Sequence, residues 1–314
     1  LIEYAAFFGS IRILQYLHQN DARISPSIWL YAIHSQNPII IDFLQQKGIQ
    51  IQDMKEVICE SIKCHHNNIA RYFMNMIDNL EENNEYKSNP IFFSFRYFNY
   101  EIIPSKLNNI KYVLHYACKY SYPILVNFLT KDDKIDVNEE VLVSEDVIET
   151  PLNISSKKKN LEIVDILLKN PRIEIGVYAL KGLENITEIT IPSSSKIIGK
   201  SAFEGCTSLV HVVIPSSVTK IDDLAFLNCT SLVKVVDHSK ITEYPTSCFE
   251  NCKSLKEINI PTSVKHLGQN AFLHCESLEE IEIPSSVETI SCSTFCGCKS
   301  LKKLNLPPSV VQVL

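Results

Sequence analysis

The sequence predicts an α + β tandem-repeat solenoid, helical in its first part and a β-solenoid of 23-residue coils in its second. Two observations predict this fold. A phenylalanine recurs every 23 residues through the second part, and a small residue followed by apolar residues eight and twelve positions later recurs through the first. The chain of 314 residues exceeds the size of a usual single core, but a repeat array escapes that limit because each unit packs only on its neighbours.

The helical units come first in the chain. A small residue lets two helices approach closely, and the apolar residues after it belong to the second helix of the pair. Five units share this pattern, and their small residues are Ala5, Ala32, Ser61, Ala117 and Ser155. The long gap after the third unit leaves room for one degenerate unit over residues 92–100, and the polar run 78–89 is expected to be an exposed loop.

Two of the helical units are close to the ankyrin consensus. One reads Leu-His-Tyr-Ala at 114–117, and the other reads Thr-Pro-Leu-Asn at 150–153, with Asn153 where that consensus has histidine. The opening stretch of the chain resembles the divergent ankyrin block carried by some protist proteins. The resemblance implies an ankyrin-like helical array over residues 1–175.

The β-solenoid follows from a strict register. Five phenylalanines stand 23 residues apart, and each is followed by cysteine three positions later and by leucine after three more; the phenylalanines are Phe203, Phe226, Phe249, Phe272 and Phe295. In one coil, residues 211–214 alternate, with Val212 and Ile214 inward and His211 and Val213 outward, which predicts a short half-buried strand. Only neighbouring coils can cover the inward residues, so stacking is obligatory.

Two coils depart from this repeat. Asp237 and His238 stand where the other coils have an aliphatic residue and a proline, and this departure is expected to shape a local pocket. A truncated first coil over residues 179–190 has Leu183 in the place of cysteine. We expect it to join the helices to the β-solenoid.

The run from Ile214 to Leu232 carries the full repeat, Ile-Pro-Ser-Ser-Val through Ala-Phe to Cys and Ser-Leu. It closely resembles the BspA-like leucine-rich repeats, which occur in bacterial surface proteins and in large families of protist proteins. The resemblance implies a leucine-rich repeat β-solenoid over residues 176–314. Because members of this family are implicated in adhesion and in binding extracellular matrix proteins, it also implies a binding module without chemistry of its own.

Composition limits the partners. The formal net charge is -6, and no arginine follows Arg172, which argues against a nucleic-acid partner. No apolar run is long enough to cross a bilayer, so we expect no membrane segment in this stretch. The chain opens inside an expected helix and closes part-way through a coil, so both ends are expected to be fragment boundaries.

Three local motifs could carry chemistry, and none meets the requirements of its site. Gly199-Lys200-Ser201 resembles the end of a phosphate loop, but Ser194 stands where that loop needs glycine. Two groups have zinc-capable side chains without the paired spacing of a structural zinc site; they are Cys59, Cys64, His65 and His66, and Cys292, Cys296 and Cys298. We therefore expect no catalytic residue, no cofactor and no metal site.

The repeat cysteines are expected to be free. Stacked coils hold equivalent Cβ atoms about 4.8 Å apart with parallel vectors, whereas a disulfide needs about 3.8 Å and converging ones. We expect these thiols to be buried as small apolar side chains, which favours a reducing compartment.

These observations predict a non-catalytic protein-binding scaffold in the cytoplasm, with a cell-surface adhesin or antigen as the alternative. Two adjacent strands place valines beside a histidine and a lysine on the outer face, and an apolar patch rimmed by charge is how interaction sites often look. The expected partner-binding residues are Val210, His211, Val213, Val233, Lys234 and Val236. The identity of the protein partner and the oligomeric state stay open.

Overall fold

The computed structural model describes residues 1–76, 90–102, 112–144 and 147–313. The chain divides into two compact units, residues 1–111 and residues 112–314. The second unit holds the last two helix pairs together with the β-strand coils, so the boundary expected at 175 lies within it. The loop expected over 78–89 lies outside the described residues.

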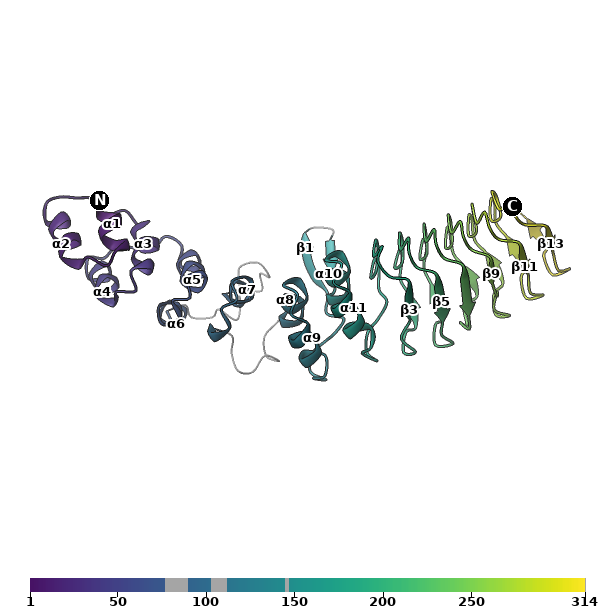
Figure 1. Cartoon of the computed structure of the whole chain (residues 1–314), viewed down its shortest axis with the longest axis horizontal. Coiled ribbons are helices and arrows are strands. Elements are labelled where there is room, and N and C mark those ends of the chain that lie inside the picture. The colour runs from purple at the N-terminus through teal and green to yellow at the C-terminus, as the bar shows by residue number, and fades with distance from the viewer. Residues whose placement is uncertain (77–89, 103–111, 145–146, 314) are drawn as a thin grey trace. The chain divides into compact units, whose positions relative to one another are not determined.

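The first unit consists of helix pairs joined by tight turns (Figure 1). Its elements are α1 (Ile2–Phe7), α2 (Ile11–Gln19), α3 (Ile28–His34), α4 (Pro38–Gln46), α5 (Met54–Lys63), α6 (Asn67–Met74), α7 (Pro90–Arg96) and the 3-10 turn η1 (Tyr100–Ile102). The first three pairs coincide with the first three predicted units, and α7 lies where the degenerate unit was predicted.

The small residues of the pattern are buried where the first helices of successive pairs meet. Ala5, Ala32 and Ser61 are at most 6% exposed, and α3 packs on both α1 and α5. The turn after each first helix is tight: in the third pair, the His66 amide donates to the Ser61 carbonyl at 2.8 Å, and His65 has a left-handed φ of 58°. These turns therefore hold their side chains in defined places.

One apolar position of the first pair is not as the pattern predicts. Ile13 is 55% exposed, and Leu14 is fully buried in its stead. Leu14 lies three residues before Leu17, which is partly buried against the same core, so these two residues form the inward stripe of α2. The aromatic centre of this core is Trp29, which contacts Phe73 edge to face at 5.9 Å.

The second unit begins with two helix pairs, which the sequence predicted, and a hairpin, which it did not predict. These elements are α8 (Val113–Lys119), α9 (Pro123–Leu129), β1 (Val141–Ser144), β2 (Val147–Glu149), α10 (Pro151–Lys157) and α11 (Leu161–Leu168). Thr150 caps α10 by accepting a hydrogen bond from the Asn153 amide at 3.2 Å. The Asn153 side chain donates to the Val177 carbonyl, and Ser156 donates to the Ala179 carbonyl, so α10 covers the backbone of the first coil.

After α11 the chain winds into stacked parallel coils (Figure 1). The strands of one face are β3 (Glu188–Thr190), β5 (His211–Ile214), β7 (Lys234–Asp237), β9 (Glu257–Ile258), β11 (Glu280–Glu282) and β13 (Lys303–Asn305). The strands of the other face are β4 (Ile197–Ile198), β6 (Lys220–Ile221), β8 (Glu243–Tyr244), β10 (His266–Leu267), β12 (Thr289–Ile290) and β14 (Gln312–Val313). Paired residues such as Val213 and Val236 stand 23 apart, which confirms the predicted register.

The phenylalanine column is the centre of the β-solenoid. Phe203, Phe226, Phe249 and Phe272 have no exposed surface, and the rings of successive coils stack with centroids 4.8, 5.1 and 5.6 Å apart. Phe295 continues the stack at 5.6 Å and is half-buried. Each coil therefore relies on the next for burial of its largest side chain.

The repeat cysteines are free, as predicted, and the first four are buried while Cys298 is half-buried. Their thiols have a further role that the sequence did not reveal. Cys229 Sγ donates to the Phe203 carbonyl in the preceding coil at 3.2 Å, and the same contact recurs at 3.2 to 3.3 Å through the column. A cysteine thus both fills the core and links successive coils.

The irregular coil contains a buried, hydrogen-bonded polar pair. Asp237 is 2% exposed and accepts hydrogen bonds from the Tyr244 hydroxyl at 2.6 Å and from the Ser239 amide at 2.8 Å. Tyr244 is fully buried at a position that is Ile221 or Leu267 in neighbouring coils. The carboxylate therefore fills the interior of the coil.

Candidate protein-binding face

The candidate face is the outer surface of β5 and β7. The structure places the six predicted residues together there: His211, Val213 and Lys234 are exposed, while Val210, Val233 and Val236 are half-buried. The parallel register sets His211 beside Lys234 and Val213 beside Val236. Among the four valines, only Val213 is strongly exposed, at 51%, so the apolar patch is smaller than the composition suggested. The binding role of these residues stays a prediction.

A groove of about 880 Å³ begins at this patch and runs along α11. His211 and Val213 form part of its wall, and β3 forms its floor through Ile189. The opposite wall comes from Leu161 and Leu168 of α11. This wall could not be predicted, because the packing of a helix pair on the first coil follows from neither repeat pattern.

Strand β3 adds backbone groups to the groove. In the described residues β3 ends its sheet, whose order is β3, β5, β7 and β9. Its outward side chains, Glu188 and Thr190, are exposed beside the groove. The edge of a sheet presents backbone donors and acceptors to any extended segment that lies beside it.

A second, smaller hollow of about 420 Å³ lies on the same face, with Lys234, Val236 and Asn259 in its lining. Lys234 contacts Glu257 at 2.6 Å, and this hydrogen bond lowers the pKa of the exposed Glu257 carboxyl. The side-chain amide of Asn259 accepts a hydrogen bond from the backbone N–H of Asp237 and donates one to the Asp237 carbonyl. The hollow thus lies beside the irregular coil, although Asp237 itself does not line it.

Elsewhere the charged residues of the coils are paired along the stack. Five ion pairs at 2.6 to 3.3 Å join residues that stand 23 apart; they are Lys181 with Glu204, Lys234 with Glu257, Lys265 with Glu288, Glu276 with Lys299, and Glu279 with Lys302. Exposed pairs of this kind add little stability.

Comparison with known families identifies the coils. Residues 173–302 and 265–313 match the family model described as the BspA type leucine rich repeat region, in six copies. The coils are BspA-type leucine-rich repeats. This match does not extend to the helical pairs before residue 173. Leucine-rich repeats are generally protein-interaction modules.

Solved structures of leucine-rich repeat proteins resemble part of the chain. One from Eubacterium ventriosum is 25% identical over 46% of this chain, with a TM-score of 0.43, and one from Bacteroides ovatus is 35% identical over 46%, with a TM-score of 0.42. One from T. pallidum is 33% identical over 43% of this chain, with a TM-score of 0.42. The chain spans 39%, 37% and 64% of these three chains. A search of curated proteins finds no match.

Gly199 of the Gly-Lys-Ser motif has a structural role in the leucine-rich repeats. A Cβ at this position would lie 2.4 Å from the backbone of Gly176 in the adjacent turn, so only glycine fits. Lys200 and Ser201 follow in a turn without the helix that a phosphate loop needs. The motif is therefore explained by the close approach of two backbones.

The two zinc-capable groups behave differently. In the described part of the chain, Cys292, Cys296 and Cys298 do not converge on a metal-sized space. Cys64 and His66 do converge, and they do so with His34, which the sequence analysis had not singled out.

Across the same described residues, no helix has the length and apolar character needed to span a bilayer.

Proposed function

We propose that this protein is a non-catalytic scaffold whose leucine-rich repeats hold a protein partner on the β3, β5 and β7 face. The observation that carries the proposal is the groove of about 880 Å³ that ends at this face, with the predicted residues His211 and Val213 in its wall. Pockets that bind a protein segment combine an apolar interior with a few fixed polar groups. This groove has that character.

The lining of the groove defines the partner. Leu161, Ile189 and Val213 offer apolar contacts, and Glu188 adds a carboxylate at the margin, whereas Asp165 there is paired with Lys169. A fitting partner is an extended segment with one or two aliphatic or aromatic anchors and a basic flank. Such a segment would also meet the open edge of β3 with its backbone, as peptides do when they add a strand to a sheet.

The helix pairs are proposed to be ankyrin-like repeats that provide a second interaction surface. The close packing of α1, α3 and α5 at Ala5, Ala32 and Ser61 supports this reading, as does the hairpin β1–β2 between the last two pairs. A repeat array of this type exposes its loops and one helical face along its length.

The location of the protein has two candidate answers. Our expectation of the cytoplasm gains no support from the comparisons, although the eleven free cysteines favour a reducing compartment. BspA-type repeats occur in bacterial surface proteins, which favours the adhesin alternative. Labelling of intact cells with an impermeant reagent separates the two: labelled protein places the face outside the cell, and protection until lysis places it inside.

The binding face is tested with a double variant. Val213→Lys with Val236→Lys adds two charges at exposed and half-buried positions of the face, so it should release the partners captured by the intact protein while circular dichroism stays unchanged. The matched control is Ser216→Lys with Thr262→Lys, which adds the same charge at exposed turns that line neither hollow. Equal capture by the folded face variant and by the control would move the binding site away from this face.

A further inference from the structure

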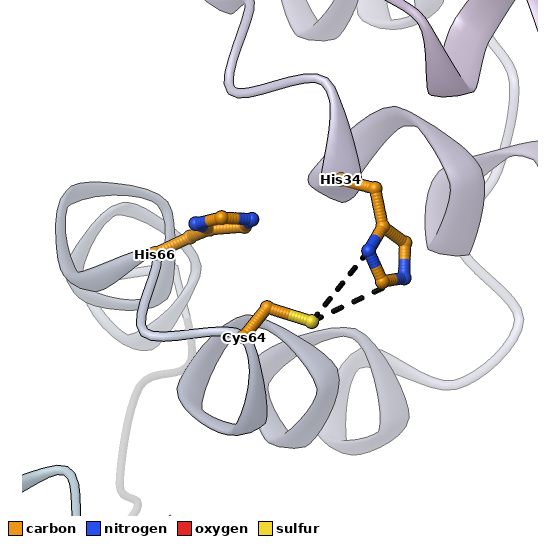
Figure 2. A group of neighbouring side chains, drawn as sticks. All are labelled: His34, Cys64 and His66. Atoms are coloured by element: carbon orange, nitrogen blue, oxygen red, sulfur yellow. Dashed lines mark hydrogen bonds between the residues drawn. The ribbon is translucent and has the colours of Figure 1, made fainter.

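A group of side chains that could hold a metal converges in the first unit, whereas the face described above belongs to the second. His34 is the last residue of α3, Cys64 follows the end of α5, and His66 precedes α6 (Figure 2). The three ligand atoms lie within 4.8 Å of one another. Figure 2 shows the three side chains pointing toward a common space from two separate turns.

The backbone brings these residues together through the same contacts that build the helix pairs. Ala32 and Ser61 are fully buried and let α3 and α5 pack closely, which places the ends of the two helices side by side. The tight turn at His65 then directs Cys64 and His66 from one loop toward the same space. The arrangement is therefore fixed by regular structure.

The distance between the first two ligands already suits a tetrahedral metal. Cys64 Sγ lies 3.6 Å from His34 Nδ1. With zinc bonds of about 2.3 Å to sulfur and about 2.0 Å to nitrogen, a tetrahedral centre sets these two atoms about 3.5 Å apart. The ligand nitrogen of His66 lies within 4.8 Å of the other two ligand atoms, and two nitrogens in such a centre lie roughly 3.3 Å apart, so a small movement of the His66 ring completes the third corner.

Each histidine also has a polar neighbour of the kind that orients metal ligands. Glu60 Oε1 lies 3.3 Å from His34 Nε2, so it can accept that N–H and leave Nδ1 with its lone pair toward Cys64. The Gln36 side-chain amide lies 2.9 Å from His66 Nδ1. With its amide turned so that the oxygen faces the ring, Gln36 accepts the Nδ1 proton and leaves Nε2 for a ligand.

Zinc binding at this group requires the Cys64 thiol to lose its proton. Binding forms the sulfur–metal bond, breaks the S–H bond and releases one proton to the solvent.

We propose that His34, Cys64 and His66 bind one zinc ion, with Glu60 and Gln36 as positioning residues. A thiolate and two imidazoles suit zinc and disfavour magnesium and calcium, which prefer oxygen ligands. Three protein ligands leave the fourth corner to water. The ion ties the turn after α3 to the turn between α5 and α6, so it links two successive helix pairs.

The test uses the full chain with Cys292→Ser and Cys296→Ser, because exposed thiols add a background of nonspecific thiolate–cobalt contacts to the spectrum. Cobalt(II) serves as the spectroscopic probe for zinc. We expect one equivalent of cobalt to bind with a thiolate-to-cobalt absorption band, and zinc to displace it. Added zinc should also raise the melting temperature, because a ligand that binds only the folded state stabilises it.

The variants assign the band to this site. In the same background, Cys64→Ser should abolish the band, and His34→Gln or His66→Gln should weaken zinc binding at least tenfold. Glu60→Gln should keep the band and weaken binding less. Cys59→Ser is the matched control, since Cys59 is a half-buried thiol of α5 outside the cluster, and it should bind as the parent does. A folded parent that binds no cobalt, or a Cys64→Ser protein that retains the band, would overturn the proposal.

Discussion

At the scale of single residues, the interior of the coils holds buried polar atoms with fixed hydrogen-bond partners. The cysteine column shows this most regularly, because every thiol donates to a carbonyl of the coil before it. Burial raises the pKa of the Cys206 thiol and, less strongly, that of Cys298, which it brings to about 11. Since the thiolate is the reactive form, we expect the buried Cys206 thiol to react slowly in the folded protein.

Thiol labelling tests this burial. In the native protein, a small alkylating reagent should modify the exposed Cys292 and Cys296 promptly, which provides an internal positive control. The four buried thiols of the column should react only after denaturation; they are Cys206, Cys229, Cys252 and Cys275. Mass spectrometry of the labelled peptides distinguishes the two classes, and native labelling of the column at the rate of Cys292 would contradict the structure.

The pair formed by Asp237 and Tyr244 is tested by removing one partner and then both. Asp237→Ala leaves the Tyr244 hydroxyl buried without its acceptor, which should cost about 1–3 kcal/mol of unfolding free energy. Asp237→Ile with Tyr244→Leu restores the side chains of the regular coils and should recover most of that loss, because replacing both partners by apolar groups leaves none unpaired. Urea denaturation measures both. Equal stability of the single and double variants would show that the unpaired Tyr244 hydroxyl is not the cause of the loss.

At the scale of elements, the coils followed from the sequence and the helix pairs did so only in part. The strand pairings of the face with β5 and β7 could be predicted, because apolar residues recur at their inward positions at a fixed interval of 23 residues, whereas the second strand of each coil was not predicted. Packing between helix pairs could not be predicted, since their small residues recur at unequal intervals. That is why Cys64 and His66 stood out while His34 did not: the two turns meet only through the contact of α3 with α5. The groove along α11 was missed for the same reason.

The phenylalanine column is the element whose disruption should destabilise the protein most. Phe249→Ala removes a fully buried ring that stacks on both neighbours, so it should cost about 3–5 kcal/mol. Val213→Ala, at an exposed position of the same β-solenoid, is the control and should change stability little. Thermal and urea denaturation measure the difference, and a Phe249→Ala protein as stable as the control would refute the register.

At the scale of the whole molecule, the helix pair α10–α11 serves as the first cap of the leucine-rich repeats. A repeat array needs a terminal unit that covers the core of its last coil. Here α10 donates side-chain hydrogen bonds to the backbone at Val177 and Ala179, groups that would otherwise lack a partner coil. The compact unit of residues 112–314 includes this cap, whereas the family match begins at 173.

Two fragments test the cap. Residues 112–314 should fold and melt in one cooperative transition, because they retain both helix pairs and every coil. Residues 173–314 lack the cap and expose the apolar surface of the first coil, so they should melt at a lower temperature or aggregate. Size-exclusion chromatography and circular dichroism compare them. Identical melting of the two fragments would show that the coils need no helical cap.

The irregular coil has a consequence for assembly. In an array of near-identical coils, a chain emerging during synthesis can pair a coil with the wrong neighbour and become trapped in a shifted stack. Asn259 binds both the backbone amide and the backbone carbonyl of Asp237, so it joins the irregular coil to the coil that follows. The Asp237 carboxylate is closed by Tyr244 of its own coil, and the other coils have an aliphatic residue at each of these two positions. The irregular coil therefore has an interior unlike that of any other coil, and it gives a repetitive sequence one internal landmark.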